Sequence, residues 1–226
     1  MKLIIQKEIL DNFDQPIIGV VKVCGTDNHG EAEEISRLLR DVEKQTRIDF
    51  QKLESHGHHP NLIAWRKAYK KFGSDPHQYR CSAESLVRRV LKGESVPHIN
   101  KLVDIYNYIS VKYVVPVGGE DTDTLVGNLQ LALASGTEFF VRLNGTENDP
   151  PVPGEVVYKD DEGVICRRWN WREAERTKLT EETKNAIIAI DALFPLDRTM
   201  VESATNELAS LIKRFCGGEI ETEIYS

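Results

Sequence analysis

Residues 81–121 constrain the fold most, because they combine two one-faced helices with a buried strand. Apolar residues recur three and four positions apart along each helix: Leu86, Val87, Val90 and Leu91 in the first, and Ile99, Leu102, Val103, Tyr106 and Ile109 in the second. Gly93 and Pro97 separate the two helices. We expect an apolar strand to follow them and to open into an acidic Gly-Gly loop at residues 118–121.

Three polar residues of the second helix, Asn100, Asp104 and Asn107, fall close to its apolar face. A polar group near a core must be hydrogen-bonded. The three side chains therefore either tie the helix to neighbouring backbone as a structural network or line a pocket.

Elsewhere the pattern predicts strands near both ends of the chain and helices in the middle. Strands are predicted at residues 4–10, 17–23, 128–134, 138–143, 156–159, 164–171 and 220–225, and helices at residues 31–46, 61–72, 180–194 and 199–215. This order is not a regular βαβ alternation. We expect an α+β fold of mixed or antiparallel sheets, partly barrel-like, packed with helices.

Charge and cysteine usage narrow the class of protein. The formal net charge of −7 argues against a protein that coats nucleic acid, so no DNA partner is expected, although a local basic patch is allowed. No apolar run is long enough to cross a bilayer, and residues 1–10 lack the features of a signal peptide. The four cysteines are far apart, which predicts reduced thiols. We expect a cytoplasmic protein without a membrane partner.

Three histidines, His56, His58 and His59, invite a metal interpretation. They lie in a loop with Gly57 and Pro60, and no carboxylate or cysteine stands at a familiar ligand spacing. We therefore expect no metal site, and no other cofactor is signalled.

Three segments match the motifs of a known domain. Residues 97–108, Pro-His-Ile-Asn-Lys-Leu-Val-Asp-Ile-Tyr-Asn-Tyr, resemble the "P-I-N-x-x-V-D-x-x-N-Y" helix of the B3/B4 domain, the editing domain in the β subunit of bacterial phenylalanyl-tRNA synthetase. Residues 136–145 are similar to the family's "G-E-x-x-x-x-L-D-G" strand and turn. Residues 179–188 are similar to its "V-T-E-E-T-x-N-V-L-L" segment. The resemblance covers residues 81–193.

The resemblance implies a single B3/B4 unit over residues 1–226. Residues 76–195 would form the core, residues 1–75 an N-terminal extension of strands and two helices, and residues 196–226 a C-terminal helix and edge strand. The motifs of an aminoacylating core are absent, so the implied activity is hydrolysis in trans of a mischarged tRNA, typically tyrosine on a phenylalanine tRNA. The alternatives are a non-catalytic RNA-binding or protein-interaction module with the same fold, and a pocket for a free amino acid.

The resemblance also assigns individual positions. The family's pocket asparagine falls on Asn107. Its pocket histidine falls near Gly118, so that histidine is missing. Its glutamate, which recognises the tyrosine hydroxyl, falls near Glu175, and the Gly-Gly pair before that glutamate is replaced by Glu173 and Ala174.

Residues 167–176 combine tryptophans with arginines. In a strand, Trp169 and Trp171 would share one face, while Arg168, Asn170 and Arg172 would share the other. One interpretation is tryptophans in the core and arginines in solvent. The other is an aromatic wall beside guanidinium groups that bind the end of an RNA. The arginines expected to contact RNA are Arg167, Arg168, Arg172 and Arg176.

A second basic region supports a phosphate partner. Between residues 62 and 92, eight cations face only Asp75 and Glu84, a net charge of 8 − 2 = +6: Arg66, Lys67, Lys70, Lys71, Arg80, Arg88, Arg89 and Lys92. This cluster either seats a tRNA backbone or is an ordinary solvated surface.

Ester hydrolysis needs a positioned water, a group that recognises the α-ammonium, and donors for the oxyanion. The expected catalytic residues are Glu175, Asn107 and Glu120. The expected substrate-binding residues are Gly118, Gly119, Asn144, Trp169, Asn170, Trp171 and Glu173. No Ser-His or Cys-His pairing is signalled, so we expect direct attack by water, assisted by the terminal ribose hydroxyl. The expected partner is the aminoacyl 3′ end of tRNA.

Overall fold

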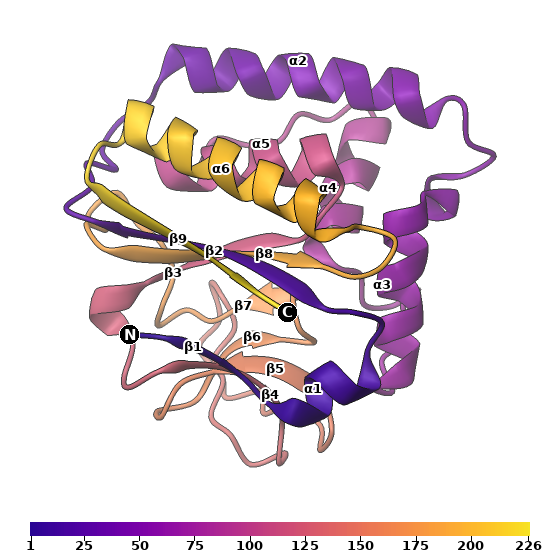
Figure 1. Cartoon of the computed structure of the whole chain (residues 1–226), viewed down its shortest axis with the longest axis vertical. Coiled ribbons are helices and arrows are strands. Elements are labelled where there is room, and N and C mark those ends of the chain that lie inside the picture. The colour runs from indigo at the N-terminus through magenta and orange to yellow at the C-terminus, as the bar shows by residue number, and fades with distance from the viewer.

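The computed structural model describes residues 1–226 and stacks helices on two sheets (Figure 1). The helices are α1 (Lys7–Asn12), α2 (Glu33–Phe50), α3 (Pro60–Lys71), α4 (Ser82–Leu91), α5 (Lys101–Tyr113) and α6 (Arg198–Phe215), and 3-10 turns lie at His56–His58 and Thr122–Thr124. The strands are β1 (Leu3–Ile5), β2 (Ile17–Cys24), β3 (Val117–Asp121), β4 (Leu129–Leu133), β5 (Val156–Lys159), β6 (Val164–Arg167), β7 (Arg172–Glu173), β8 (Ala186–Ala192) and β9 (Glu219–Tyr225).

The upper sheet has four antiparallel strands in the order β3-β8-β2-β9. Two of its strands come from opposite ends of the chain, because residues 18–24 of β2 near the N-terminus pair with residues 219–225 of β9 at the C-terminus. Helices α5 and α6 cover one face of this sheet, and α2 lies outside them (Figure 1).

The lower sheet has five strands in the order β1-β4-β5-β6-β7. β1 and β4 are parallel, and the other pairs are antiparallel. The predicted α+β class and mixed sheets are thus confirmed. The expected partly barrel-like closure is wrong, because the two sheets remain separate and open, without a strand pair between them.

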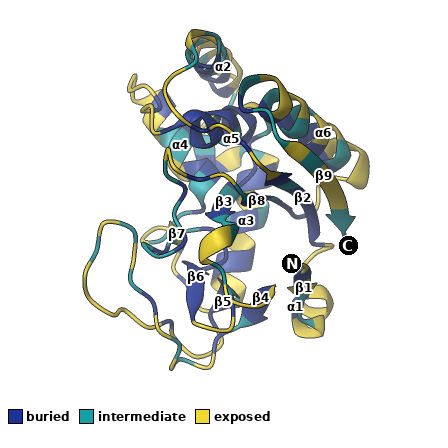
Figure 2. Cartoon of the chain, turned by 90° about the vertical axis from the view of Figure 1, so that its left-hand side faces the viewer, coloured by how far each residue is buried: buried dark blue, intermediate teal, exposed yellow.

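Two apolar cores hold these layers together. One lies between the helices and the upper sheet and contains Leu102, Ile109 and Leu208. The other lies between the two sheets, where Ile18 and Leu131 pack with α3. Strands β2, β3 and β8 of the upper sheet are largely buried, whereas the edge strand β9 and the outer faces of α2 and α6 reach solvent (Figure 2).

Several predicted elements differ from the structure. Residues 180–194 form no helix: their second half is strand β8, which is buried on both faces between the helices and the lower sheet. A strand covered on both sides is apolar without alternation, so its run of isoleucines also fits a helical pattern. Residues 4–10 divide into β1 and α1, and residues 138–143 form only isolated bridges. The expected Gly-Gly loop is part of strand β3.

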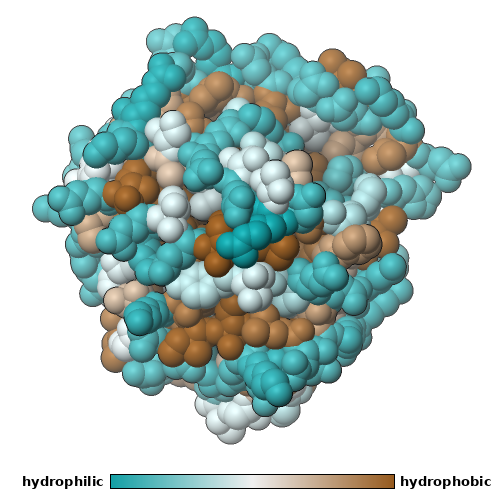
Figure 3. Space-filling model, viewed as in Figure 1, coloured by the Kyte–Doolittle hydropathy of each residue, from teal (hydrophilic) through white to brown (hydrophobic).

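The surface seen in Figure 3 is mostly hydrophilic, with apolar side chains gathered in a band below its centre. None of the helices is both long and apolar enough to pass through a membrane. All four cysteines are free, and three of them are buried.

Candidate active site

An open cleft of about 260 Å³ lies where α4, α5 and the segment around β7 meet. Its walls carry two serines, two aromatic rings and several polar groups from distant parts of the chain. The lining residues are Ser82, Ser85, Leu86, Tyr106, Asn107, Val117, Leu143, Asn170, Trp171, Arg172 and Glu173. The structure therefore brings together five of the predicted site residues: Asn107, Asn170, Trp171, Arg172 and Glu173.

Helix α5 places Asn107 in this cleft. Asn100 caps the helix: its side chain accepts a hydrogen bond from the Val103 amide at 3.0 Å and donates one to the Leu179 carbonyl at 3.2 Å. Buried Asp104 accepts the Ile99 amide at 3.0 Å. Asn100 and Asp104 thus form a structural network, as the first alternative predicts. Half-buried Asn107 lines the pocket, as the second alternative predicts.

Gly118 makes room for a carboxylate. A Cβ atom at this position would lie 2.7 Å from Oε1 of Glu173, so any other residue here would require the Glu173 carboxylate to move. Glu173 therefore occupies space beside Gly118 where the resemblance expects a histidine side chain. Gly119 points to the opposite face of β3, where a Cβ atom would meet Leu179 and Ile188 at 3.0 Å. Its substrate-binding role stays a prediction.

Behind the cleft lies a smaller cavity of about 30 Å³, room for one or two water-sized groups. The two spaces share Asn170 and Glu173 as lining residues. The cavity holds three carboxyl groups and no cation, and it is lined by Gly118, Glu120, Leu129, Tyr158, Cys166, Trp169, Asn170, Glu173, Ile187, Ala189 and Asp191.

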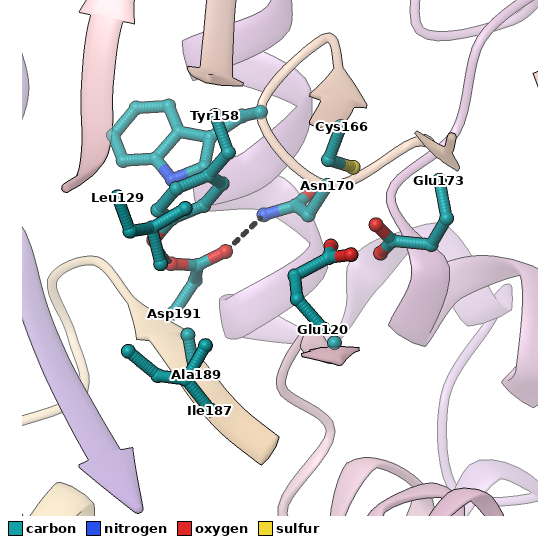
Figure 4. A pocket seen from close by; sticks show the side chains of 11 residues that line it. Glu120, Leu129, Tyr158, Cys166, Asn170, Glu173, Ile187, Ala189 and Asp191 are labelled. Carbon is teal, nitrogen blue, oxygen red and sulfur yellow. Dashed lines mark hydrogen bonds between the residues drawn. The ribbon is translucent and has the colours of Figure 1, made fainter. Parts of the chain in front are cut away.

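The carboxyl groups of Glu120 and Glu173 face each other across this cavity (Figure 4). Burial, followed by repulsion from Glu173, raises the pKa of Glu120 well above its ordinary value. Burial raises the pKa of Glu173 as well. The two neighbouring carboxyl groups in this dry site therefore oppose each other's ionisation.

Asp191 is the third carboxyl group and was not predicted. It accepts hydrogen bonds from the Tyr158 hydroxyl at 2.6 Å and from Asn170 Nδ2 at 3.1 Å (Figure 4). Burial raises the pKa of Asp191 to about 6, against these two hydrogen bonds, which lower it. The sequence did not reveal Asp191 because residues 180–194 were predicted to form a helix, in which the Asp191 side chain would have a different direction from the one it has in strand β8. An aspartate inside an isoleucine-rich apolar run was the available signal.

We expect Asp191 to make the protein less stable as pH rises from about 4 to about 6. Its pKa is raised from 3.8 to about 6, so the folded state binds the proton more tightly than the unfolded state does. The free energy of unfolding should therefore fall by about 3 kcal/mol across this window. Urea titrations from pH 4 to 7 measure this slope.

Asp191→Asn should flatten that slope by the share that Asp191 contributes, because asparagine does not titrate whereas Glu120 and Glu173 still do. The new amide also faces the Asn170 amide, which adds an offset in stability that does not change with pH. Exposed Asp14→Asn is the matched control and should leave the slope intact. Equal slopes in wild type and Asp191→Asn would contradict the assignment.

The segment after β6 is a turn, so the strand predicted over residues 164–171 is wrong beyond Arg167. Arg168 and Trp169 adopt left-handed backbone angles, with φ of 48° and 67°. This reversal directs Trp169 into the core, where its ring packs edge-on against Phe13 and Trp65 at centroid distances of 5.0 Å. Trp169 also lines the inner cavity, whereas only Trp171 lines the cleft.

Three of the four predicted RNA-binding arginines are engaged within the protein. Buried Arg167 pairs with Glu155, with Nε–O and Nη2–O distances of 2.9 Å. Buried Arg168 stacks its guanidinium 3.7 Å from the Tyr79 ring centroid. Arg176 pairs with Asp160 at 2.8 Å. Exposed Arg172 forms no ion pair and lines the cleft, so it is the arginine available to a phosphate. RNA contact by the other three stays a prediction.

Glu175 lies outside the lining of both cavities. Its carboxylate forms an ion pair with Lys178 and accepts the Asn144 backbone amide at 2.8 Å. The hydrogen bond to Lys178 is the largest cause that lowers the pKa of Glu175. Asn144 has φ of 59° and forms the expected tight turn with Gly145. Catalysis by Glu175 and substrate binding by Asn144 stay predictions.

A buried carboxylate neutralises part of the positive charge in the basic region at residues 62–92. Glu84 is buried and accepts both Nε and Nη2 of Arg66, at 3.0 and 2.7 Å. Arg80 lies 3.6 Å from the same carboxylate. The exposed members without an ion pair are Lys67, Lys70, Lys71 and Lys92.

The three clustered histidines have separate partners. His56 lies 3.5 Å from Glu84, His58 lies 3.7 Å from Glu54, and His59 stacks on Phe50. No cluster of three or more histidine, cysteine, aspartate or glutamate side chains has the arrangement of a metal site.

Comparison with known proteins bears on the predicted resemblance. The phenylalanine–tRNA ligase beta subunit of Fusobacterium nucleatum is 28% identical over 149 residues, which cover 56% of this chain and 18% of that protein. The same subunit of Bartonella henselae is 30% identical over 144 residues, which cover 54% of this chain and 18% of that protein. The chain thus spans less than a fifth of the length of these two relatives.

An N-terminal fragment of the phenylalanyl-tRNA synthetase beta subunit from Pyrococcus horikoshii aligns with 97% of this chain and 50% of its own, at 14% identity and a TM-score of 0.49. The family model described as "B3/4 domain" matches residues 64–217, a wider span than the motifs predicted. Because this match covers more than half of the 226 residues, the predicted resemblance is confirmed, and the chain belongs to the B3/4 domain family.

Proposed function

We propose that this protein binds the aminoacyl end of a tRNA in the cleft and hydrolyses a mischarged ester in trans. The observation that carries the proposal is the cleft of about 260 Å³ in which Asn107 from α5 meets Arg172 and Glu173 from β7. Membership of the family supports the tRNA-related role.

The chemistry follows from the groups that line the cleft. A water molecule attacks the ester carbonyl carbon and transfers a proton to the Glu173 carboxylate. The Asn107 amide orients the water or the carbonyl oxygen. The bond from carbonyl carbon to ribose oxygen then breaks, the ribose oxygen receives the proton held by Glu173, and a free amino acid leaves the tRNA.

The walls of the cleft suit a nucleotide. The half-buried Trp171 ring, held edge-on by Tyr79 at 5.0 Å, offers an aromatic surface to the terminal adenine. The Arg172 guanidinium lies 5.3 Å from the centroid of the same ring, so a stacked base would place its phosphate near this cation.

Incubation with a panel of mischarged tRNAs tests the proposal. We expect at least one aminoacyl ester to lose its amino acid faster than it does in buffer, and correctly charged tRNAs to be spared. If every member decays at the buffer rate while uncharged tRNA still binds, the protein is a binding module and the hydrolytic proposal is wrong.

We expect Arg172→Ala to weaken tRNA binding about 3- to 10-fold and to lower the salt dependence by about one phosphate contact. The reason is that Arg172 is the one cleft arginine whose charge is not already paired within the protein. Filter binding at several salt concentrations measures both effects. Arg37→Ala is the matched control, since Arg37 is an exposed arginine on α2, outside the cleft. An identical salt slope in wild type and Arg172→Ala would contradict this role.

A further inference from the structure

The inner cavity behind the cleft needs an occupant. Oε2 of Glu120 and Oε2 of Glu173 are buried and have no hydrogen-bond partner within the protein, and both residues line this space. The Glu120 side chain is almost completely enclosed, since the residue is only 6% exposed. Native proteins rarely leave such groups unsatisfied, so these atoms mark a binding position.

The groups that line the cavity indicate the charge of the group that would bind there. Its lining contains the carboxyl groups of Glu120, Glu173 and Asp191 and no lysine, arginine or histidine. The carboxyl groups of Glu120 and Glu173 face each other across this space, so both would stabilise a positive charge placed between them (Figure 4).

The size and position of the cavity identify the occupant's shape. Its volume of about 30 Å³ accommodates one nitrogen with its hydrogens but not an aromatic ring. It adjoins the cleft through Asn170 and Glu173, which line both spaces. An ammonium group on a flexible chain therefore fits, with the carbon chain in the cleft and the charge in the cavity.

We propose that the inner cavity, with Glu120 as its recognition group, binds the side-chain ammonium of the substrate, so that the edited residue is a diamino acid of the lysine or ornithine type. An ammonium offers three donors and can serve two carboxylates at once, whereas a hydroxyl offers one donor. This inference rests on the proposed function, because it names the amino acid that the cleft receives.

The test compares lysine with norleucine, which has nearly the same shape but no ammonium group. Each is joined through a stable amide to 3′-amino-adenosine, and the binding of both analogues is measured by calorimetry. We expect the lysyl analogue to bind at least tenfold more tightly than the norleucyl analogue. Glu120→Gln should abolish this preference, because glutamine preserves the shape and cannot carry a negative charge.

Each outcome separates the inference from the proposed function. Equal binding of the two analogues to wild type, or a preference for a tyrosyl or seryl analogue, would overturn the ammonium site and indicate a cavity filled by water or a hydroxyl. A preference for the lysyl analogue without hydrolysis of any mischarged tRNA would support the ammonium site and refute the hydrolase. Hydrolysis restricted to neutral aminoacyl esters would support the hydrolase and refute the ammonium site.

Discussion

Asn107→Ala and Glu173→Gln should each slow the hydrolysis of a susceptible mischarged tRNA by about 10²- to 10⁴-fold, the range for removing a general base or an oriented polar group from a reaction site. Both side chains line the cleft, and neither belongs to the apolar core. The measurement is the single-turnover deacylation rate with saturating protein, which separates chemistry from binding.

Glu175→Ala is the variant to compare with Glu173→Gln, because it tests which of the two carboxylates is catalytic. The resemblance assigns the family's glutamate to this position, but the structure holds Glu175 in an ion pair with Lys178 outside the cleft. If the geometry determines the chemistry, Glu175→Ala keeps a rate within a few-fold of wild type. A loss as large as that of Glu173→Gln would return the catalytic role to Glu175 and remove it from Glu173.

Trp169→Ala should lower the free energy of unfolding by about 3–5 kcal/mol, the usual cost of truncating a large buried aromatic residue. Trp169 has no exposed surface and packs against both Phe13 and Trp65. Urea denaturation followed by circular dichroism measures the loss.

Trp171→Ala provides the contrast, because Trp171 is half-buried at the cleft. It should cost less stability than Trp169→Ala but should weaken tRNA binding. A stable Trp169→Ala protein that had lost tRNA binding would show instead that Trp169 acts as a recognition surface.

The sequence predicts the helices well wherever one face alone is apolar. Helix α6 begins one residue before its predicted start and ends at the predicted residue. Helix α5 contains the predicted apolar positions Leu102, Val103, Tyr106 and Ile109, but Ile99 precedes the helix and is exposed. The hairpin of β5 and β6 was also predicted, because a polar turn at residues 160–163 separates two β-branched runs. In both cases local pattern and tertiary environment agree.

Prediction fails where burial removes the pattern. Strand β8 has two covered faces, so its residues show no polar face by which to tell strand from helix. The left-handed turn at Arg168 and Trp169 fails for a different reason. Neither residue type signals positive φ, and the turn is held by tertiary contacts such as the Trp169 amide to the Val156 carbonyl at 2.6 Å.

The candidate site was predictable in composition but not in arrangement. Asn107 was found because a motif and a helical face coincide there. Glu173 could not be ranked above Glu175 from sequence, since that choice depends on which carboxylate lies beside Gly118. Arg167 and Arg176 could not be recognised as internal pairs, because their partners Glu155 and Asp160 are distant in sequence.

The interleaving of the chain ends in the upper sheet has a practical consequence for expression. A fragment cut at the limits of the family match, residues 64–217, would lack β1, β2 and β9. Strand β8 would then have one unpaired edge, and the core would lose Ile18 and Val21. An open apolar strand edge is a template for aggregation. Cloning boundaries for this protein must therefore include both ends of the polypeptide, even though the cleft itself lies within the matched region.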